Sequence, residues 1–211
     1  MRVLVFAAAA LGLCGCATGP IMDVAQCQTA DWKQIGYQDG ATGHDATRYA
    51  ARDQACMTAG YPGKSELYLA GHAEGVRAFC TPQNGFRAGV DGRSYAGQCP
   101  PDLDPQFRNA YRDGRDIYDA TSALRSVESS LNSLRDERDR IERKIAMNEG
   151  GLAMQGIPPA EAERIRNELF RLRSERNRVD NDMRDREREY RWRSDDLSRL
   201  RYRIGAPYGS W

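Results

Sequence analysis

The sequence predicts a mainly α protein in which a small, disulfide-closed, glycine- and aromatic-rich helical head precedes a long antiparallel coiled-coil hairpin. Three observations predict this fold: apolar residues recur at heptad spacing over residues 116–204, four cysteines follow a signal-like segment, and a short glycine pattern recurs between residues 36 and 114. With 40% hydrophobic and 29% charged residues, the chain of 211 residues is lean for one large core. The expected parts are a signal peptide at 1–15, the head at 16–104, the hairpin at 105–204 with helices at about 105–148 and 159–203, and a tail at 205–211.

The charge balance argues against nucleic acid as a partner. The chain has 31 basic and 30 acidic side chains, which gives a formal net charge of +1. A chain with so even a balance has no single-sign field to attract a polyanion. The basic residues are almost all arginine, which pairs well with carboxylates, so we expect the charges to pair mostly with one another.

The N-terminus has the pattern of a secretory signal that ends at a lipid-acceptor cysteine. Residues 1–15 combine one arginine with an apolar run that is too short to span a membrane as a helix. The segment Leu13-Cys14-Gly15-Cys16 resembles the bacterial lipobox, which implies that Cys16 is acylated and anchors the mature chain. Cys14 is the competing acceptor, and an ordinary cleaved signal is the alternative. By the same resemblance, Ala17 after the anchor implies the outer membrane, with the protein facing the periplasm.

Four cysteines follow the signal segment, and an even number in an oxidising compartment predicts two disulfides. They are Cys27, Cys56, Cys80 and Cys99, and they allow three connectivities. Sequential pairing is favoured because each pair then brackets one glycine-containing unit. A zinc site is disfavoured because the chain has no Cys-x-x-Cys and its two histidines, His44 and His72, lie far apart in sequence, so no metal or cofactor is expected.

A five-residue pattern recurs in the head: a small residue, two variable residues, an acid and a glycine. Its copies are Gly36 to Asp39-Gly40, Gly71 to Glu74-Gly75, Ala88 to Asp91-Gly92 and Ala110 to Asp113-Gly114. Small residues four apart share a helix face and let another backbone approach closely. In the competing interpretation each acid-glycine pair is a turn or a helix end. Aromatic residues, among them Trp32, are expected to fill the remaining space.

The order and spacing of these residues resemble a family of Gram-negative lipoproteins known as domain of unknown function 2799, over about residues 27–118. The resemblance is carried by Cys27, Trp32, Gly36, Asp39-Gly40, Gly43, Cys56, Tyr68, Gly71, Glu74-Gly75, Phe79-Cys80, Asn84-Gly85-Phe86, Gly89, Gly92, Tyr95, Cys99, Phe107, Tyr111 and Gly114. It implies no activity and no catalytic residue.

Enzymatic chemistry would require two of the four pattern acids to meet in a cleft, where they could hydrolyse cell-wall glycans by acid-base catalysis. Nothing in the sequence brings two of them together, and acids before glycine are typical of turns. A Gly-x-Ser-x-Gly nucleophile signature is absent, and both histidines are expected to be exposed or capping residues. Asp102 and Asp104 are interpreted as the linker and N-cap of the long helix. We therefore expect a protein that is not an enzyme.

The hairpin is predicted from heptads in two segments. With Ile117 at position a, the first segment places Ile117, Leu124, Leu131, Arg138 and Ile145 at a, and Ala120, Val127, Leu134, Ile141 and Asn148 at d. The second places Leu169, Arg176, Met183, Tyr190, Leu197 and Ile204 at a, and Ile165, Leu172, Val179, Arg186, Arg193 and Leu200 at d. The glycines at 150–151 are expected to end the first helix at residue 148, and the prolines at 158–159 to begin the second.

Antiparallel pairing of a with d gives opposed residue numbers a constant sum, either 303 or 310, and a hinge near residue 154 favours 310. That register pairs Ile145 with Ile165, Ile141 with Leu169, Leu131 with Val179, and Val127 with Met183. The arginines at 138, 176, 186 and 193 interrupt the seam and must pair with acids or extend into solvent. Pairing between two chains to form a dimer is the alternative.

The sequence thus favours a lipid-anchored envelope protein with a structural or docking role. The expected contacts are with the membrane through Cys16 and with an envelope protein or the cell wall through residues 116–211. The alternative is a cell-wall hydrolase, or an activator of one, that uses the head carboxylates.

Overall fold

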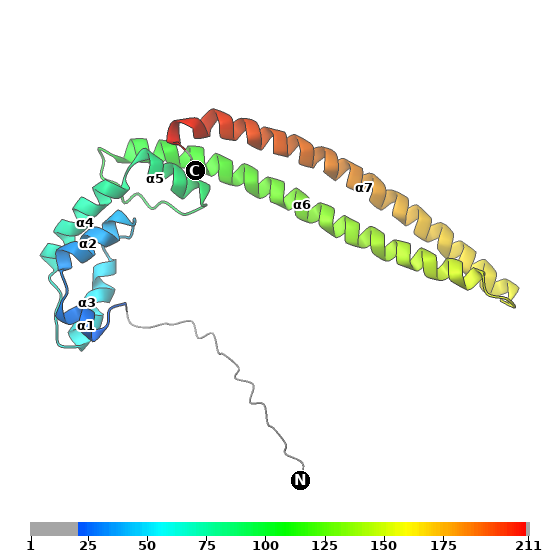
Figure 1. Ribbon diagram of the computed structural model, residues 1–211, viewed down its shortest axis with the longest axis horizontal. Helices are drawn as coiled ribbons and strands as arrows, with labels where there is room; N and C mark the ends of the chain where they lie inside the picture. The colour runs from blue at the N-terminus through cyan, green and yellow to red at the C-terminus, as the bar shows by residue number, and fades with distance from the viewer. Residues whose placement is uncertain (1–20, 210–211) are drawn as a thin grey trace, which may run out of the picture. The chain divides into compact units, whose positions relative to one another are not determined.

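The computed structural model describes residues 21–209 and shows an all-helical chain (Figure 1). The signal segment, the lipidation candidate Cys16 and the terminal Trp211 lie outside these residues. The described part contains seven α-helices and one 3-10 helix without any strand, so the predicted mainly α fold is confirmed. Within residues 21–209, no helix is long and apolar enough to cross a membrane.

The chain divides into two compact units between Phe79 and Cys80. Unit 1 contains α1 (Val24–Gln28), α2 (Trp32–Ala41), α3 (Arg48–Thr58) and α4 (Ser65–Phe79). Unit 2 contains α5 (Pro82–Val90), α6 (Asp104–Leu152), α7 (Pro159–Gly205) and the 3-10 helix η1 (Ala206–Tyr208). The segment predicted as one head, residues 16–104, is therefore shared between the units, because α5 packs against α6.

The first helix of each helix pair, α2 in unit 1 and α5 in unit 2, begins with a side-chain N-cap. The carboxylate of Asp31 accepts a hydrogen bond of 3.0 Å from the backbone N–H of Gln34 at the start of α2. The hydroxyl of Thr81 accepts one of 3.2 Å from the N–H of Asn84 at the start of α5, where Pro82 needs no N–H partner. Each cap satisfies a backbone donor that the first turn of a helix leaves free.

Two disulfides have the favoured sequential pairing, Cys27–Cys56 in unit 1 and Cys80–Cys99 in unit 2. The first joins cysteines that are 29 positions apart, and the second joins cysteines that are 19 positions apart. Each disulfide stabilises the fold by about 3–4 kcal/mol because it lowers the entropy of the unfolded chain. Cys27 and Cys56 lie in the core of unit 1 with Trp32 and Tyr68.

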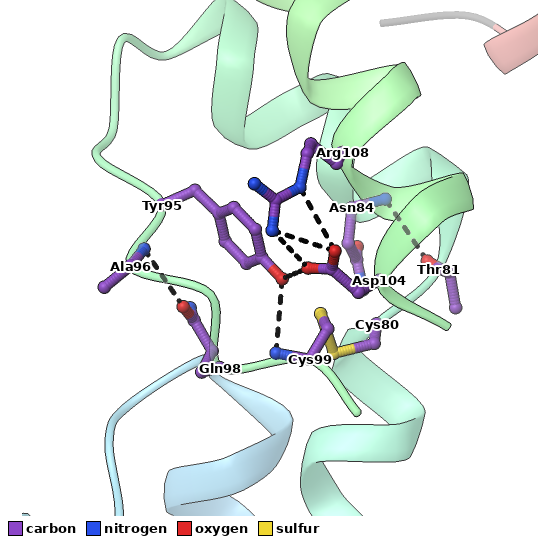
Figure 2. The surroundings of a disulfide bond; sticks show 9 residues. All are labelled: Cys80, Thr81, Asn84, Tyr95, Ala96, Gln98, Cys99, Asp104 and Arg108. Carbon is purple, nitrogen blue, oxygen red and sulfur yellow. Dashed lines mark hydrogen bonds and ion pairs between the residues drawn. A yellow bond between two sulfur atoms is a disulfide. The ribbon is translucent and has the colours of Figure 1, made fainter. Parts of the chain in front are cut away.

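The Cys80–Cys99 bond lies beside a polar network that ties the preceding loop to the start of α6, as Figure 2 shows. The hydroxyl of Tyr95 donates to the carboxylate of Asp104 and accepts a hydrogen bond of 3.2 Å from the N–H of Cys99. Arg108, one turn along α6, pairs with the same carboxylate at 2.8 Å. The hydrogen bond from Tyr95 lowers the pKa of Asp104 below its ordinary value, and Arg108 adds to this effect. Asp104 therefore anchors the loop; the N-cap position itself belongs to Leu103, without a side-chain cap.

In unit 2, α6 and α7 lie side by side and antiparallel as one hairpin (Figure 1). The prediction that α6 ends at residue 148 is wrong, since the helix continues through Gly150 and Gly151 to Leu152. Neither glycine adopts a positive φ, and Gly151 faces Ile165 of α7, where its added Cβ would lie 3.5 Å from the side chain. A glycine costs a helix interior only about 1 kcal/mol, so two glycines do not by themselves end a long helix. The turn instead uses Gly156, with a φ of 79°.

The register of the hairpin differs from both predicted alternatives. The ion pairs Glu142–Arg176 (3.5 Å) and Glu149–Arg173 (2.8 Å) have residue-number sums of 318 and 322, and the Gly151–Ile165 contact has 316. All three sums lie above 310, and two of them lie within one of 317, which is the next sum that pairs a with d, so the contacts favour 317 over 303 and 310. The difference from 310 is one heptad, which keeps every a and d position on the seam. The apolar cluster near the hinge accordingly includes Val179 and Met183 with Ile141, Ile145, Leu169, Leu172 and Leu134.

The four seam arginines pair with acids, as the sequence predicts. The ion pairs are Arg138–Asp139, Arg176–Glu142, Arg186–Glu189 and Arg193–Glu189. Hydrogen bonds from Arg193 and Arg186 lower the pKa of Glu189 below its ordinary value. Between the apolar cluster at the hinge and the one that joins Ile117 to Leu197, the seam thus depends partly on exposed ion pairs, which stabilise weakly.

Candidate functional site

In unit 1, α2 and α4 cross in backbone contact because glycines occupy both facing surfaces. A Cβ atom added at any of four glycines would lie 1.9–2.3 Å from a backbone carbonyl oxygen of the other helix. The four contacts are Gly36 to Tyr68 (2.0 Å), Gly40 to His72 (2.3 Å), Gly71 to Lys33 (1.9 Å) and Gly75 to Tyr37 (2.1 Å). Real Cβ atoms essentially never approach so closely, so any larger residue would force the helices apart.

In unit 2, α5 crosses the start of α6 in the same way. The corresponding contacts are Gly85 to Phe107 (2.4 Å), Gly89 to Tyr111 (2.2 Å) and Gly114 to Phe86 (2.1 Å), each measured to the facing carbonyl oxygen. Ala110, which is 1% exposed, occupies the fourth small position. In both units, therefore, small residues on the facing helix surfaces allow the two backbones to come into contact.

The two interpretations of the recurring pattern therefore apply to different copies. The copies that end at Gly40, Gly75 and Gly114 lie on helix faces in close backbone contact. The copy that ends at Gly92 is a helix end, because Asp91 is the C-cap of α5 and Gly92 has a φ of 70°. The helix face of α5 is formed instead by Gly85 and Gly89.

The two crossings correspond residue by residue. On the first helix, Gly36, Gly40 and Gly43 of unit 1 correspond to Gly85, Gly89 and Gly92 of unit 2, an offset of 49. On the second helix, Tyr68, Gly71, Gly75 and Phe79 correspond to Phe107, Ala110, Gly114 and Tyr118, an offset of 39. Gly43 and Gly92 both have positive φ and face the rings of Phe79 and Tyr118, respectively. Tyr68 and Phe107 are both fully buried. The chain therefore contains one packing motif twice.

Unit 1 differs from unit 2 by a buried carboxylate, Asp39, where α5 has Ala88. Asp39 is 3% exposed and forms two hydrogen bonds of 2.7 Å with the guanidinium of Arg52 from α3. The hydroxyl of Tyr68 donates to the same carboxylate at 2.8 Å, and Arg48 lies 3.5 Å away. Burial raises the pKa of Asp39, but the hydrogen bonds from Arg52 and Tyr68 outweigh burial and hold it below its ordinary value. Burial and Asp39 raise the pKa of Tyr68.

The Asp39 cluster joins three helices and is suited to structure more than to proton transfer. A general acid needs a raised pKa near the working pH, whereas two arginines hold Asp39 ionised. His72 is 8% exposed, stacks on Tyr68 with ring centroids 5.9 Å apart, and donates through Nε2 to the carbonyl of His44 at 2.7 Å. The expectation that both histidines are exposed or capping residues is therefore wrong for His72.

At the unit 2 crossing, the C-terminal Tyr208 covers Phe86 and Asp113. The rings of Tyr208 and Phe86 stack with centroids 4.3 Å apart and an interplanar angle of 13°. The hydroxyl of Tyr208 donates to Oδ2 of Asp113 at 2.6 Å. Burial, reinforced by Asp113, raises the pKa of Tyr208 to about 12. The end of the hairpin is thus fastened to its own base.

The remaining pattern acids are exposed and have other partners. Glu74 forms an ion pair of 2.8 Å with Lys33, and each side chain is more than half exposed. Asp91 pairs with Arg93 at 3.4 Å. Neither unit therefore brings two pattern acids onto one shared partner. Among the described residues, no three His, Cys, Asp or Glu side chains are grouped to hold a metal ion.

Sequence reasoning missed Arg48 and Arg52, which hold Asp39; for Tyr208 it allowed packing of the C-terminal aromatic residues on the head but did not identify Asp113 as the partner. The arginines lie four apart on a short helix, a spacing that puts them on one face and could have indicated a buried acid partner. No local signal links Tyr208 to Asp113, 95 positions earlier in the chain.

These features define a helical protein whose two glycine-based helix crossings precede a coiled-coil hairpin. The model of the family described as Protein of unknown function (DUF2799) matches residues 31–116, in agreement with the resemblance seen in the sequence. The matched segment begins at the N-cap of α2 and ends just after Gly114, so it contains both crossings and excludes most of the hairpin. No curated protein and no solved structure matches the chain.

Proposed function

We propose that this is a non-enzymatic, lipid-anchored protein of the outer membrane that faces the periplasm and binds an envelope protein through the outer face of α7. Cys16 carries the lipid in this proposal. In this proposal the hairpin binds the partner, and unit 1 and the α5–α6 crossing of unit 2 form the folded remainder of the protein.

The observation that carries the proposal is a row of exposed aromatic side chains on a helix that is otherwise charged. Phe170, Trp192 and Tyr202 of α7 are 77%, 60% and 86% exposed. With Leu169 at heptad position a, they occupy positions b, c and f, which face away from the partner helix in a two-stranded coiled coil. At 1.5 Å per residue, the row extends about 48 Å along the helix.

These aromatic residues bury little of their surface against the hairpin, although Arg193 lies over the ring of Trp192 with its Cζ 5.7 Å from the ring centroid. Trp and Tyr are enriched among the residues that dominate protein interfaces, where each can contribute about 2 kcal/mol or more. The neighbouring arginines and acids of α7 supply a polar rim. A long partner helix or an extended groove in an envelope protein would fit this row.

The hydrolase alternative has less support. Asp39 is buried and held ionised by Arg52, Glu74 is paired with Lys33, and Asp113 is covered by Tyr208. The pKa of Asp39 is held below its ordinary value by Arg52 and Tyr68, whereas a general acid for glycan hydrolysis requires a raised one.

The test is crosslinking in cells with a photoreactive residue at position 192, followed by identification of the crosslinked protein. The triple variant Phe170→Ala, Trp192→Ala, Tyr202→Ala should weaken binding to that protein by about 30-fold or more, since a loss of 2 kcal/mol corresponds to that factor. The matched control changes Arg184 and Asp195, which are exposed at positions b and f of the same helix, to alanine. Equal binding by the triple variant and the control would refute the docking role.

The anchor is tested separately by palmitate labelling. Wild type should incorporate label and fractionate with the outer membrane, whereas Cys16→Ser should do neither. If Cys16→Ser still incorporates palmitate, Cys16 is not the lipid acceptor and this part of the proposal is refuted.

A further inference from the structure

We propose that unit 1 carries a binding site for a tyrosine-bearing turn of a partner protein, formed by Tyr37 and Glu74 beside Lys33. This site is separate from the outer face of α7, and the two proposals can fail independently.

The correspondence between the two crossings extends to Tyr37 and Glu74. In unit 1 a Cβ on Gly75 would meet the carbonyl oxygen of Tyr37, and in unit 2 a Cβ on Gly114 would meet that of Phe86. Tyr37 therefore occupies the place of Phe86. Glu74 precedes Gly75 as Asp113 precedes Gly114. Each crossing thus presents an aromatic ring on its first helix and a carboxylate on its second at equivalent positions.

In unit 2 the side chains of Phe86 and Asp113 are both in contact with Tyr208. Tyr208, held on the short 3-10 turn of residues 206–208, stacks on Phe86 and donates to Asp113. Phe86 is 1% exposed and also belongs to the buried cluster of Ala110, Ile117 and Leu197, against which Tyr208 packs. The chain itself therefore provides a precedent for the ligand: a tyrosine on a turn, with its ring on the aromatic residue and its hydroxyl on the acid.

In unit 1 the equivalent pair is uncovered. Tyr37 is 38% exposed, and the side chain of Glu74 is 58% exposed. They line an open hollow of about 300 Å³ with Asp31, Lys33 and Gln34. The volume is sufficient for a phenol ring. Lys33 contacts Oε1 of Glu74, which leaves Oε2 to accept a hydrogen bond from an incoming hydroxyl.

The chemistry of the hollow favours a phenol over other groups. A second carboxylate would be repelled by Glu74 and Asp31, and a purely apolar side chain would leave Glu74 without a new partner. A tyrosine satisfies both surfaces, since its ring stacks on Tyr37 and its hydroxyl donates to a carboxylate, a bond stronger than one between neutral groups.

The probe is a dye-labelled peptide with the sequence of residues 204–209, Ile-Gly-Ala-Pro-Tyr-Gly, titrated with the whole chain and followed by fluorescence anisotropy. We expect saturable binding that weakens at least 10-fold in Tyr37→Ala and 3-fold or more in Glu74→Gln. A peptide with phenylalanine in place of tyrosine should bind roughly 3- to 10-fold more weakly, as expected for the loss of one hydrogen bond.

The matched control is Tyr61→Ala, because Tyr61 is also 38% exposed and lies in unit 1 outside the hollow. This variant should bind the peptide like wild type. Fluorescence of the buried Trp32 checks that every variant remains folded, and both Tyr37 and Glu74 are exposed enough to be replaced without loss of the core.

Three outcomes would overturn the proposal. Absence of saturable binding at millimolar peptide is one, and unchanged binding by Tyr37→Ala is another, since the peptide would then bind elsewhere, for example by displacing Tyr208. The third is concentration-dependent dimerisation that both Tyr37→Ala and Tyr208→Ala abolish, which would assign the site to the tail of a second copy in place of a different partner.

Discussion

The close approach of α2 and α4 predicts that Gly36→Ala destabilises unit 1, although alanine is the better helix former. The added Cβ would lie 2.0 Å from the carbonyl oxygen of Tyr68, 2.8 Å from its carbonyl carbon and 3.0 Å from the N of His72. All three are backbone atoms, so no side-chain rotation relieves the clash.

The size of the effect follows from two opposed terms. Overpacking costs about 1–3 kcal/mol, and a clash of backbone with Cβ belongs at the upper end because the whole helix must move. Separating the helices also loosens the contacts at Gly40, Gly71 and Gly75. The intrinsic helix preference of alanine returns up to about 1 kcal/mol. The net expectation is a loss of about 2 kcal/mol in the free energy of unfolding of unit 1.

The assay is urea denaturation followed by the fluorescence of Trp32, which is 3% exposed and lies one turn before Gly36 on α2. The other two tryptophans, Trp192 and Trp211, are replaced by phenylalanine so that only unit 1 reports. The midpoint should fall without a change in slope, since the surface exposed on unfolding stays the same.

Gly150→Ala provides the matched control, because Gly150 is also helical but a Cβ there meets nothing within 4 Å. It should leave the Trp32 transition unchanged and stabilise unit 2 by about 0.5–1 kcal/mol, measured by circular dichroism. A Gly36→Ala protein as stable as wild type would refute the inference that backbone contact holds α2 against α4.

Three further predictions follow from the described contacts. Asp39→Asn should cost unit 1 about 3 kcal/mol by leaving Arg52 without its buried partner, and it should remove part of the acid sensitivity. The lowered pKa of Asp39 means that its contribution is present above the unfolded value of about 3.9 and is lost as the pH falls through the lower folded value, which urea midpoints measured against pH will show. Cysteines at Leu134 and Met183, whose numbers add to 317, should crosslink within one chain on oxidation, whereas cysteines at Leu131 and Val179 should not; the reverse pattern on non-reducing gels would restore the register of 310. Tyr208→Phe should destabilise the base of the hairpin by about 1 kcal/mol through the lost hydrogen bond to Asp113. Because the pKa of Tyr208 is raised, wild type should keep this contribution below about pH 10 and lose it as the pH rises toward about 12, and a Phe variant with the same alkaline profile would contradict the role of the bond.

Much of the fold could be predicted from residue spacing because the relevant signals are local. The heptads of residues 116–204 predict two helices with one apolar seam, and the structure has them at Asp104–Leu152 and Pro159–Gly205. The favoured cysteine pairing is also confirmed. The sequence places the end of α6 too early because Gly150-Gly151 is a stop signal by composition, whereas both glycines are helical here and α6 ends at Leu152.

The candidate sites could be predicted only in part. Asp39 and the glycines were singled out, but the arginines that hold Asp39 come from another helix and Tyr208 comes from the far end of the chain. The division between units was also missed, because the head looks continuous in composition while α5 packs on α6.

The sequence by itself determined which segments are helical, where the cysteines and glycines lie on them, and that the long helices share an apolar seam. These are properties of short stretches, set by periods of 3.5 or 3.6 residues and by the small side chain of glycine. Only the tertiary structure decided the hairpin register, in which opposed residue numbers add to 317. It also decided that the glycine-bearing face of α2 packs on α4 and that of α5 on α6, and that Tyr208 covers Phe86 and Asp113. The physical reason is degeneracy: a shift of one heptad leaves every seam position on the seam, and one glycine-bearing face resembles another. The choice among such equivalent pairings therefore rests on contacts between residues that are distant in the chain.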